Sequence, residues 1–93
     1  MALQARLTIT GRVQGVGYRD WMIGTARRLG LTGWVRNRHD GAVEALIVGD
    51  EGAVGRMIEA CRRGPPGARV DEIDVDPVDL DILPDGFTQL PTA

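Results

Sequence analysis

The stretch GRVQGVGYRD, residues 11–20, separates a segment with the pattern of a strand from a segment with the pattern of a helix. Residues 3–11 alternate apolar and polar side chains, which is the period of a half-buried strand. Residues 20–29 repeat apolar side chains every three to four positions, with Asp20 suited to the N-cap or first turn and Gly30 to the stop. The sequence therefore predicts a strand, a glycine-rich turn and a helix, in that order.

The rest of the chain continues the alternation of strands and helices. Asp40-Gly41 between two apolar segments is a strong hairpin signal, and the second of those segments is apolar on both faces, which favours a central strand. Acids begin and arginines end residues 50–63, which suits a helix dipole. The predicted elements are strands at 3–11, 34–37, 42–48 and 70–75, the last with a bulge near Val70, helices at 20–29 and 50–63, and a short edge strand at 87–90.

This order, βαββαβ with a possible short fifth strand, predicts an α+β fold. Right-handed crossovers place both helices on one face of an antiparallel sheet, as in ferredoxin-like sandwiches. No linker, repeat or low-complexity segment interrupts the 93 residues, so we expect one domain over 1–93. This fold carries many unrelated functions, so the function has to be argued from a site.

Charge is unevenly distributed along the chain. Residues 1–40 hold seven Arg against two Asp, a net +5, whereas residues 41–93 hold four Arg against eleven acids, a net −7. The positive half contains the glycine-rich stretch, which favours an anionic ligand there, although a solvated basic face is the simpler alternative. The chain has no Lys, which excludes a lysine nucleophile, a Schiff base and a P-loop lysine.

The glycine-rich stretch has the chemistry of an anion site. A turn between strand and helix places backbone N–H groups at a helix N-terminus, where phosphate or carboxylate binds readily. The Walker pattern is absent because the chain has no Lys, and G-x-G-x-x-G is absent because Asp20 occupies the place of the third glycine. Arg19 can hold an anion with two parallel hydrogen bonds. The alternative is that the glycines only turn the chain and Arg19 pairs with a carboxylate.

Asn37 is the second candidate residue. It ends the strand before the hairpin and shares a face with Val35. Its carboxamide can donate one hydrogen bond and accept another, so it can hold a water molecule without carrying charge. The alternative is that Asn37 only forms the turn.

Other reactive side chains fit structural roles better. Cys61 falls on the apolar stripe of the second helix and is expected to be a buried thiol, and His39 is expected to be exposed in the hairpin turn. The two tryptophans are expected to pack on the core or sheet, and Tyr18 to anchor the loop. The acids of residues 71–85 lack the spacing of a cation loop, so no metal is expected.

The chain shows neither a signal peptide nor a membrane-spanning segment. Its start lacks a basic region followed by an apolar run, and its longest aliphatic run covers only residues 45–48. One cysteine forms no internal disulfide, which suits a reducing compartment. We therefore expect a cytoplasmic location and no membrane partner. The small size of the domain favours a monomer.

Two motifs resemble the signatures of acylphosphatases. The first is Gly11-x-Val13-Gln14-Gly15-Val16-x-Tyr18-Arg19, and the second is Gly33-Trp34-Val35-x-Asn37-x-x-Asp40-Gly41-x-Val43-Glu44. They stand in the same order and at the same distance as in that family. The similarity runs from about residue 7 to residue 75, with a weaker match at Phe87, and Tyr18 replaces a frequent Phe.

The resemblance implies a ferredoxin-like fold and hydrolysis of small-molecule acyl phosphates to a carboxylate and inorganic phosphate. It implies phosphate binding by Arg19 and by the loop amides of Gln14, Gly15, Val16, Gly17 and Tyr18. It also implies that Asn37 positions the attacking water, with no metal, no cofactor and no covalent intermediate. The chemistry agrees, because a carboxylate leaving group needs little acid catalysis.

Two alternatives come from other classes of protein. The chain could be a module of a larger maturation enzyme that handles acyl or carbamoyl phosphate. It could also be a non-enzymatic module that binds RNA through aromatic side chains on neighbouring strands. No aromatic pair is expected on those strands, so no nucleic-acid partner is predicted; the side chains expected there are Leu7, Ile9, Ala42, Glu44 and Leu46.

Overall fold

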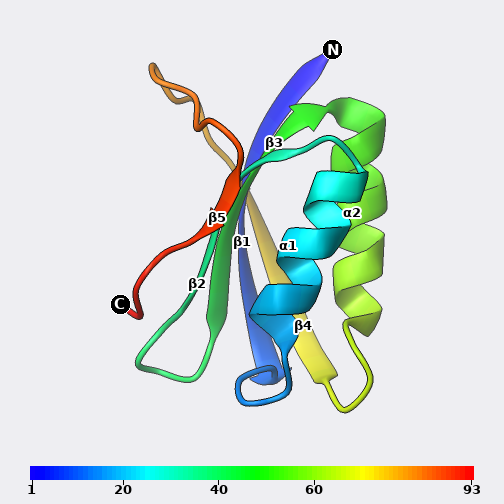
Figure 1. Ribbon diagram of the computed structural model, residues 1–93, viewed down its shortest axis with the longest axis vertical. Coiled ribbons are helices and arrows are strands. Elements are labelled where there is room, and N and C mark those ends of the chain that lie inside the picture. The colour runs from blue at the N-terminus through cyan, green and yellow to red at the C-terminus, as the bar shows by residue number, and fades with distance from the viewer.

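The predicted elements are all present in the structure, with ends shifted by two residues at most. The computed structural model describes residues 1–93 (Figure 1). The elements are β1 (Ala2–Arg12), α1 (Tyr18–Arg28), β2 (Thr32–Asn37), β3 (Val43–Asp50), α2 (Glu51–Arg63), β4 (Arg69–Pro77) and β5 (Phe87–Gln89).

The five strands form one sheet in the order β4-β1-β3-β2-β5. Neighbouring strands are antiparallel except for β5, which runs parallel to β2, so the fifth strand makes the sheet mixed rather than wholly antiparallel. The central position expected for β3 is confirmed, and residues 43–48 of this strand are buried. The βαββαβ order and this arrangement are those of the ferredoxin-like fold.

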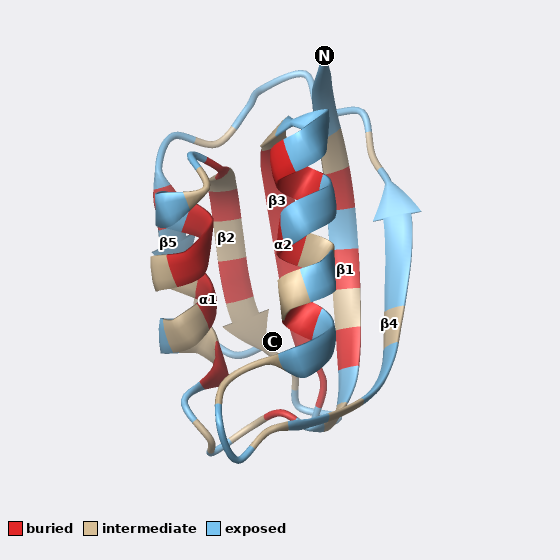
Figure 2. Ribbon diagram, turned by 90° about the vertical axis from the view of Figure 1, so that its right-hand side faces the viewer, coloured by how far each residue is buried: buried red, intermediate tan, exposed pale blue.

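Both helices cover the same face of the sheet, as Figure 2 shows. The core between the two layers contains 17 buried residues, and fully burying an aliphatic side chain of this kind contributes about 1.5–3 kcal/mol. Leu7 and Ile9 belong to this core and are fully buried. This agrees with the alternation of residues 3–11, which predicts a half-buried strand with Leu7 and Ile9 on its apolar face.

The open face carries an aromatic residue that the strand pattern did not place there. Trp34 is half-buried, and the Arg36 guanidinium lies over its ring at 4.9 Å from the ring centroid. Trp34 is the single tryptophan of β2, so this face offers one stacking platform rather than the aromatic pair that an RNA-binding sheet of this kind uses.

The edge pair β1–β4 contains the predicted irregularity. Thr10 pairs with Glu72 and Gly11 with Val70, so Asp71 is an extra residue on β4 and forms a bulge. A bulge leaves one residue unpaired and bends the strand that carries it. The bulge lies beside Val70, where the sequence predicts it, and it explains why Val70 does not share the period of two that relates Ile73 and Val75.

The two helices begin differently. Asp50 caps α2, because its carboxylate accepts hydrogen bonds from the amides of Gly52 at 3.0 Å and Ala53 at 3.4 Å. The N-cap of α1 is Gly17, which offers no side chain, and Asp20 lies in the first turn. Neither helix has the length and the apolar composition needed to cross a bilayer.

Candidate active site

The turn between β1 and α1 depends on glycine at two positions. Gly15 and Gly17 have φ angles of 74° and 78°, in the left-handed region that side chains disfavour. The helix that follows begins at Tyr18, and its first intrahelical bond runs from the amide of Trp21 to the carbonyl of Gly17. No side chain caps this helix start, so its first amides keep their capacity to bind an anion.

Tyr18 anchors this turn from the side of the core. Its side chain is 2% exposed, its hydroxyl donates a 2.6 Å hydrogen bond to the carbonyl of Cys61, and its ring contacts Trp21 edge to face. Burial raises the pKa of the Tyr18 hydroxyl, as does the neighbouring Cys61, so the hydroxyl stays a neutral donor. Val16 also packs against the core, so two side chains attach the turn to it.

A pocket of about 90 Å³ lies beside the turn. Drug-sized ligands occupy roughly 300–1,000 Å³, so this pocket suits one small group. It brings together all of the predicted site residues except Val16, together with two that were not predicted. Its lining consists of Val13, Gln14, Gly15, Gly17, Tyr18, Arg19, Asp20 and Asn37.

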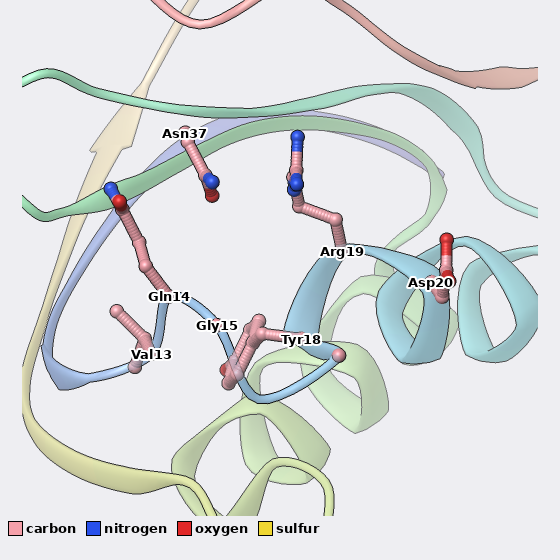
Figure 3. Close-up of a pocket in the computed structure, with 8 residues that line it drawn as sticks. Val13, Gln14, Gly15, Tyr18, Arg19, Asp20 and Asn37 are labelled. Carbon is pink, nitrogen blue, oxygen red and sulfur yellow. The ribbon is translucent and has the colours of Figure 1, made fainter.

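Arg19 reaches this pocket from the first turn of α1, and Figure 3 shows its side chain on the same side of the turn as Asn37. The side chain is half-buried and forms no ion pair within the chain. The alternative role, in which Arg19 forms an ion pair with a carboxylate of the chain, is therefore not observed. Its guanidinium keeps five donors for a ligand.

Asn37 reaches the pocket from the last residue of β2, on the same face as the buried Val35. Its amide oxygen Oδ1 is enclosed by protein and accepts no hydrogen bond. The turn itself is made by other groups, because the amide of Ala42 donates to the carboxylate of Asp40 at 3.0 Å. A buried polar atom without a partner is rare and marks a functional position or a bound water.

The Gln14 side chain contacts the hairpin, which sequence reasoning missed. Its amide nitrogen Nε2 donates to the carbonyl oxygens of Arg38 and Ala42, each at 2.8 Å. The sequence predicted only a main-chain role for this residue. No local pattern indicates such a contact, since it joins positions 24 and 28 residues apart.

The segment after β5 continues along β2 as far as the hairpin. The amide of Leu90 donates to the carbonyl of Val35 at 2.9 Å, and the amide of Ala93 donates to the carbonyl of Asn37 at 3.0 Å. The amide of His39 returns a bond of 2.7 Å to the carbonyl of Ala93. The backbone of residues 35–39, including the carbonyl of Asn37, is therefore hydrogen-bonded to residues 90–93.

The remaining reactive groups lie outside the pocket. Cys61 is fully buried in α2, as expected, and burial raises the pKa of its thiol to about 12. His39 is exposed in the hairpin turn, also as expected. Nowhere do three or more His, Cys, Asp or Glu side chains gather in a way that would hold a metal ion.

Fold and site define a class of protein: a small α+β fold in which an uncapped helix start, an arginine and a carboxamide line one pocket. Comparison with known proteins identifies the family. A family model described as Acylphosphatase matches residues 5–89. The chain is 58% identical to an acylphosphatase of Rhodospirillum rubrum over 84 residues, which are 90% of this chain and 91% of that one.

Solved structures give the same result. The crystal structure of acylphosphatase from Bacillus subtilis has a TM-score of 0.90 and 38% identity, and covers 97% of this chain and 99% of that chain. A crystal structure of full-length HypF in the phosphate- and nucleotide-bound form has a TM-score of 0.89 at 26% identity, over 99% of this chain but 12% of that chain.

The chain belongs to the acylphosphatase family. It is accordingly an enzyme of the hydrolase class, and the substrates of its family are small acyl phosphates, the mixed anhydrides of a carboxylic acid and phosphoric acid.

Proposed function

We propose that this chain hydrolyses acyl phosphates to a carboxylate and inorganic phosphate without a metal, with the phosphoryl group held by Arg19 and the amides of residues 14–18 and the water positioned by Asn37. One observation carries the proposal. The uncapped start of α1 and the unpartnered carboxamide of Asn37 line the same small pocket, although they come from different elements.

The phosphoryl group fits the donors of this pocket. Main-chain N–H groups at a helix start carry partial positive charge, and a guanidinium meets two phosphate oxygens with parallel hydrogen bonds. In phosphoryl transfer the charge is spread over three equatorial oxygens in the transition state. Donors fixed in advance at those oxygens stabilise that state without reorganisation, and this is the role we assign to Arg19 and the loop amides.

The attacking water needs a group that orients it, and Asn37 has the free hydrogen-bonding capacity. The water oxygen forms a bond to phosphorus while the bond from phosphorus to the acyl oxygen breaks, and the electron pair leaves on the carboxylate. The carboxylate is a weak base, so no strong acid is required at the leaving oxygen. The water proton ends on the phosphate product or in solvent, and placement in line supplies most of the acceleration.

The test measures release of phosphate from benzoyl phosphate, with and without a chelator. We expect Arg19→Met to abolish both turnover and competitive inhibition by phosphate. We expect Asn37→Ala to lower kcat about 100-fold or more, the cost of one positioned catalytic hydrogen bond, with inhibition by phosphate nearly unchanged. Arg12→Met is the matched control, because Arg12 is exposed and does not line the pocket.

Two results would refute the proposal. Asn37→Ala with the turnover of the parent chain would remove the water-positioning role. Loss of activity in the chelator, restored by a divalent cation, would remove the metal-free mechanism.

A second candidate function is favoured by the similarity to HypF, in which the matching region is 12% of a longer chain. A module of a larger enzyme that handles carbamoyl phosphate would have the same fold and pocket. Comparing kcat/KM for carbamoyl phosphate with that for several acyl phosphates separates the two, because a carbamoyl-specific module would strongly prefer carbamoyl phosphate.

The sequence also predicts a single domain over 1–93, a monomeric state and a cytoplasmic location, and these three stay predictions.

A further inference from the structure

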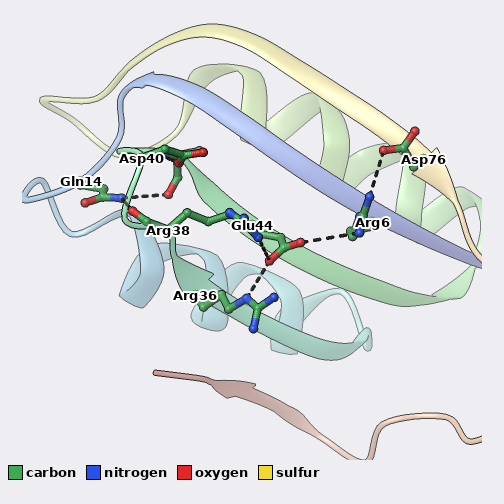
Figure 4. A network of polar contacts seen from close by, with 8 residues as sticks. Arg6, Gln14, Arg36, Arg38, Asp40, Glu44 and Asp76 are labelled. Atoms are coloured by element: carbon green, nitrogen blue, oxygen red, sulfur yellow. Dashed lines mark hydrogen bonds and ion pairs between the residues drawn. The ribbon is translucent and has the colours of Figure 1, made fainter. Parts of the chain in front are cut away.

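The carboxamide of Gln14 spans from the phosphate loop to the β2–β3 hairpin. Both of its Nε2 hydrogens are engaged, because the two acceptors, the carbonyl oxygens of Arg38 and Ala42, each lie 2.8 Å away (Figure 4). No other hydrogen bond joins residues 13–17 to residues 37–43. The two halves of the pocket are therefore connected by polar contacts at this side chain alone.

The acceptors are the groups that define the hairpin turn. The amide of Arg38 donates to the carbonyl of Ala42 at 2.8 Å, and the amide of Gly41 donates to the carbonyl of Arg38 at 3.1 Å. Gln14 adds a second donor to each of these two carbonyls. Arg38 directly follows Asn37, so Gln14 holds the backbone one residue away from the carboxamide in the pocket.

The same strand end is held on its other face. The Glu44 carboxylate is 5% exposed and accepts from Arg36 Nε at 2.6 Å and from Arg38 at 3.2 Å (Figure 4). Arg36 and Arg38 flank Asn37, and alternate residues of a strand point to opposite faces. Glu44 therefore holds the side chains that flank Asn37 on the open face, while Gln14 holds the backbone of Arg38 and Ala42 from the side of the loop.

We infer that the Gln14 side chain is a positioning residue that sets the separation between the phosphate loop and Asn37. The inference rests on the proposed function, because it requires that the loop holds the phosphoryl group and that Asn37 orients the water. In-line attack is sensitive to placement, and a shift of about 1 Å can cost about 100-fold in rate. Two hydrogen bonds from one planar group hold such a distance more tightly than apolar packing does.

The test is a double-mutant cycle between Gln14→Met and Asn37→Ala, with benzoyl phosphate as substrate and inorganic phosphate as competitive inhibitor. Methionine keeps the length and removes both donors. In the parent chain we expect Gln14→Met to lower kcat about 10-fold, while the inhibition constant for phosphate changes less than about 3-fold, since the loop amides and Arg19 remain. In the Asn37→Ala background we expect no further fall in kcat, because residues that act as a unit are not additive.

Gln4→Met is the matched control. The Gln4 side chain also joins distant backbone, because its Oε1 accepts from the amide of Leu80 at 2.8 Å, but it does so near the start of β1 and far from the pocket. We expect this variant to keep the kcat of the parent chain. Where Gln14→Met is not folded by circular dichroism, Gln14→Glu provides the same cycle, because its carboxylate has no donor for the two carbonyls.

Three outcomes overturn the inference. Additive losses of kcat in the double variant would show that Gln14 does not act through Asn37. If Gln14→Met raised the inhibition constant for phosphate by the same factor as it lowered kcat, Gln14 would be assigned to phosphate binding instead. Unchanged kcat would remove the role altogether. Failure of the proposed function is a separate result, since it would appear as full activity of the Asn37→Ala variant alone.

Discussion

The Tyr18 hydroxyl donates a 2.6 Å hydrogen bond to the carbonyl oxygen of Cys61. Tyr18 is the first residue of α1, and Cys61 lies in the last turn of α2, where carbonyl groups have no intrahelical partner. The bond therefore satisfies an orphan carbonyl at the end of one helix with the residue that begins the other. The helix start that lines the pocket is connected in this way to the end of the other helix in the same layer.

Removing this hydroxyl should destabilise the fold without removing the site. Tyr18→Phe deletes one buried hydrogen bond and leaves the Cys61 carbonyl without a partner, so we expect a loss of about 1–2 kcal/mol in the free energy of unfolding. Denaturation in urea measures this loss, and kcat should change little, because the hydroxyl is not among the groups that we propose to bind phosphate.

Labelling of Cys61 gives an independent measurement of the same variant. The thiol is fully buried with a pKa of about 12, so it reacts with a thiol reagent at neutral pH only when the structure opens. In Tyr18→Phe the labelling rate should rise about 10-fold, which corresponds to about 1.4 kcal/mol. Rapid labelling of the parent chain, or equal rates in both proteins, would contradict the account.

Alanine at Gly17 should impair phosphate binding beyond its cost in stability. The φ of 78° disfavours a side chain by about 1–2 kcal/mol, although no atom would obstruct a Cβ there. The backbone would relieve this strain by rotating at residue 17, and the first amides of α1 would then no longer point into the pocket. We therefore expect weaker inhibition by phosphate and a lower kcat/KM. Urea denaturation and inhibition assays measure the two effects.

Gly30→Ala is the matched control for that variant. Gly30 has a φ of 73° with equally open space, but it follows the other end of α1 and does not line the pocket. We expect the same loss of stability with normal inhibition by phosphate. If both variants bind phosphate equally well, the conformation at Gly17 has no part in the site.

Glu44 should contribute to stability in a pH-dependent way. Burial of the carboxyl opposes its ionisation, but hydrogen bonds and charge from Arg36 and Arg38 outweigh this and hold the pKa of Glu44 below its ordinary value of 4.5. At pH 7 we expect Glu44→Gln to lower the free energy of unfolding by about 1–3 kcal/mol, less than for a fully buried pair because the arginines are partly exposed.

The sign of the pH dependence follows from the lowered pKa. The native state favours the carboxylate, so the contribution is complete above pH 4.5 and disappears as the pH falls through the lower native value. The difference between Glu44→Gln and the parent chain should therefore shrink toward pH 3. Glu59→Gln is the control, since Glu59 is 76% exposed and its pair with Arg62 should be worth nearly nothing. A difference for Glu44 that stays constant from pH 7 to pH 3 would contradict the assignment.

The sequence by itself determined the secondary-structure elements and the position of the glycine-rich turn. Apolar side chains repeat every two residues in a strand and every three to four in a helix, and these repeats indicate which side chains face the core. This information is local. All seven elements were therefore predicted within two residues of their ends. Gly15 and Gly17 mark the turn, and the acids at residues 50 and 51 mark the start of a helix. The buried thiol of Cys61 followed from the apolar stripe of α2 in the same local way.

Only the tertiary structure decided which residues meet. Asn37 reaches the pocket of Arg19 because β2 ends beside the start of α1, and that depends on the order of strands in the sheet. The covered face of β1, the parallel pairing of β5 and the contact of Gln14 with the hairpin also depend on contacts between distant segments. No local pattern encodes such contacts, because their free energy appears only once the sheet and the helices have assembled.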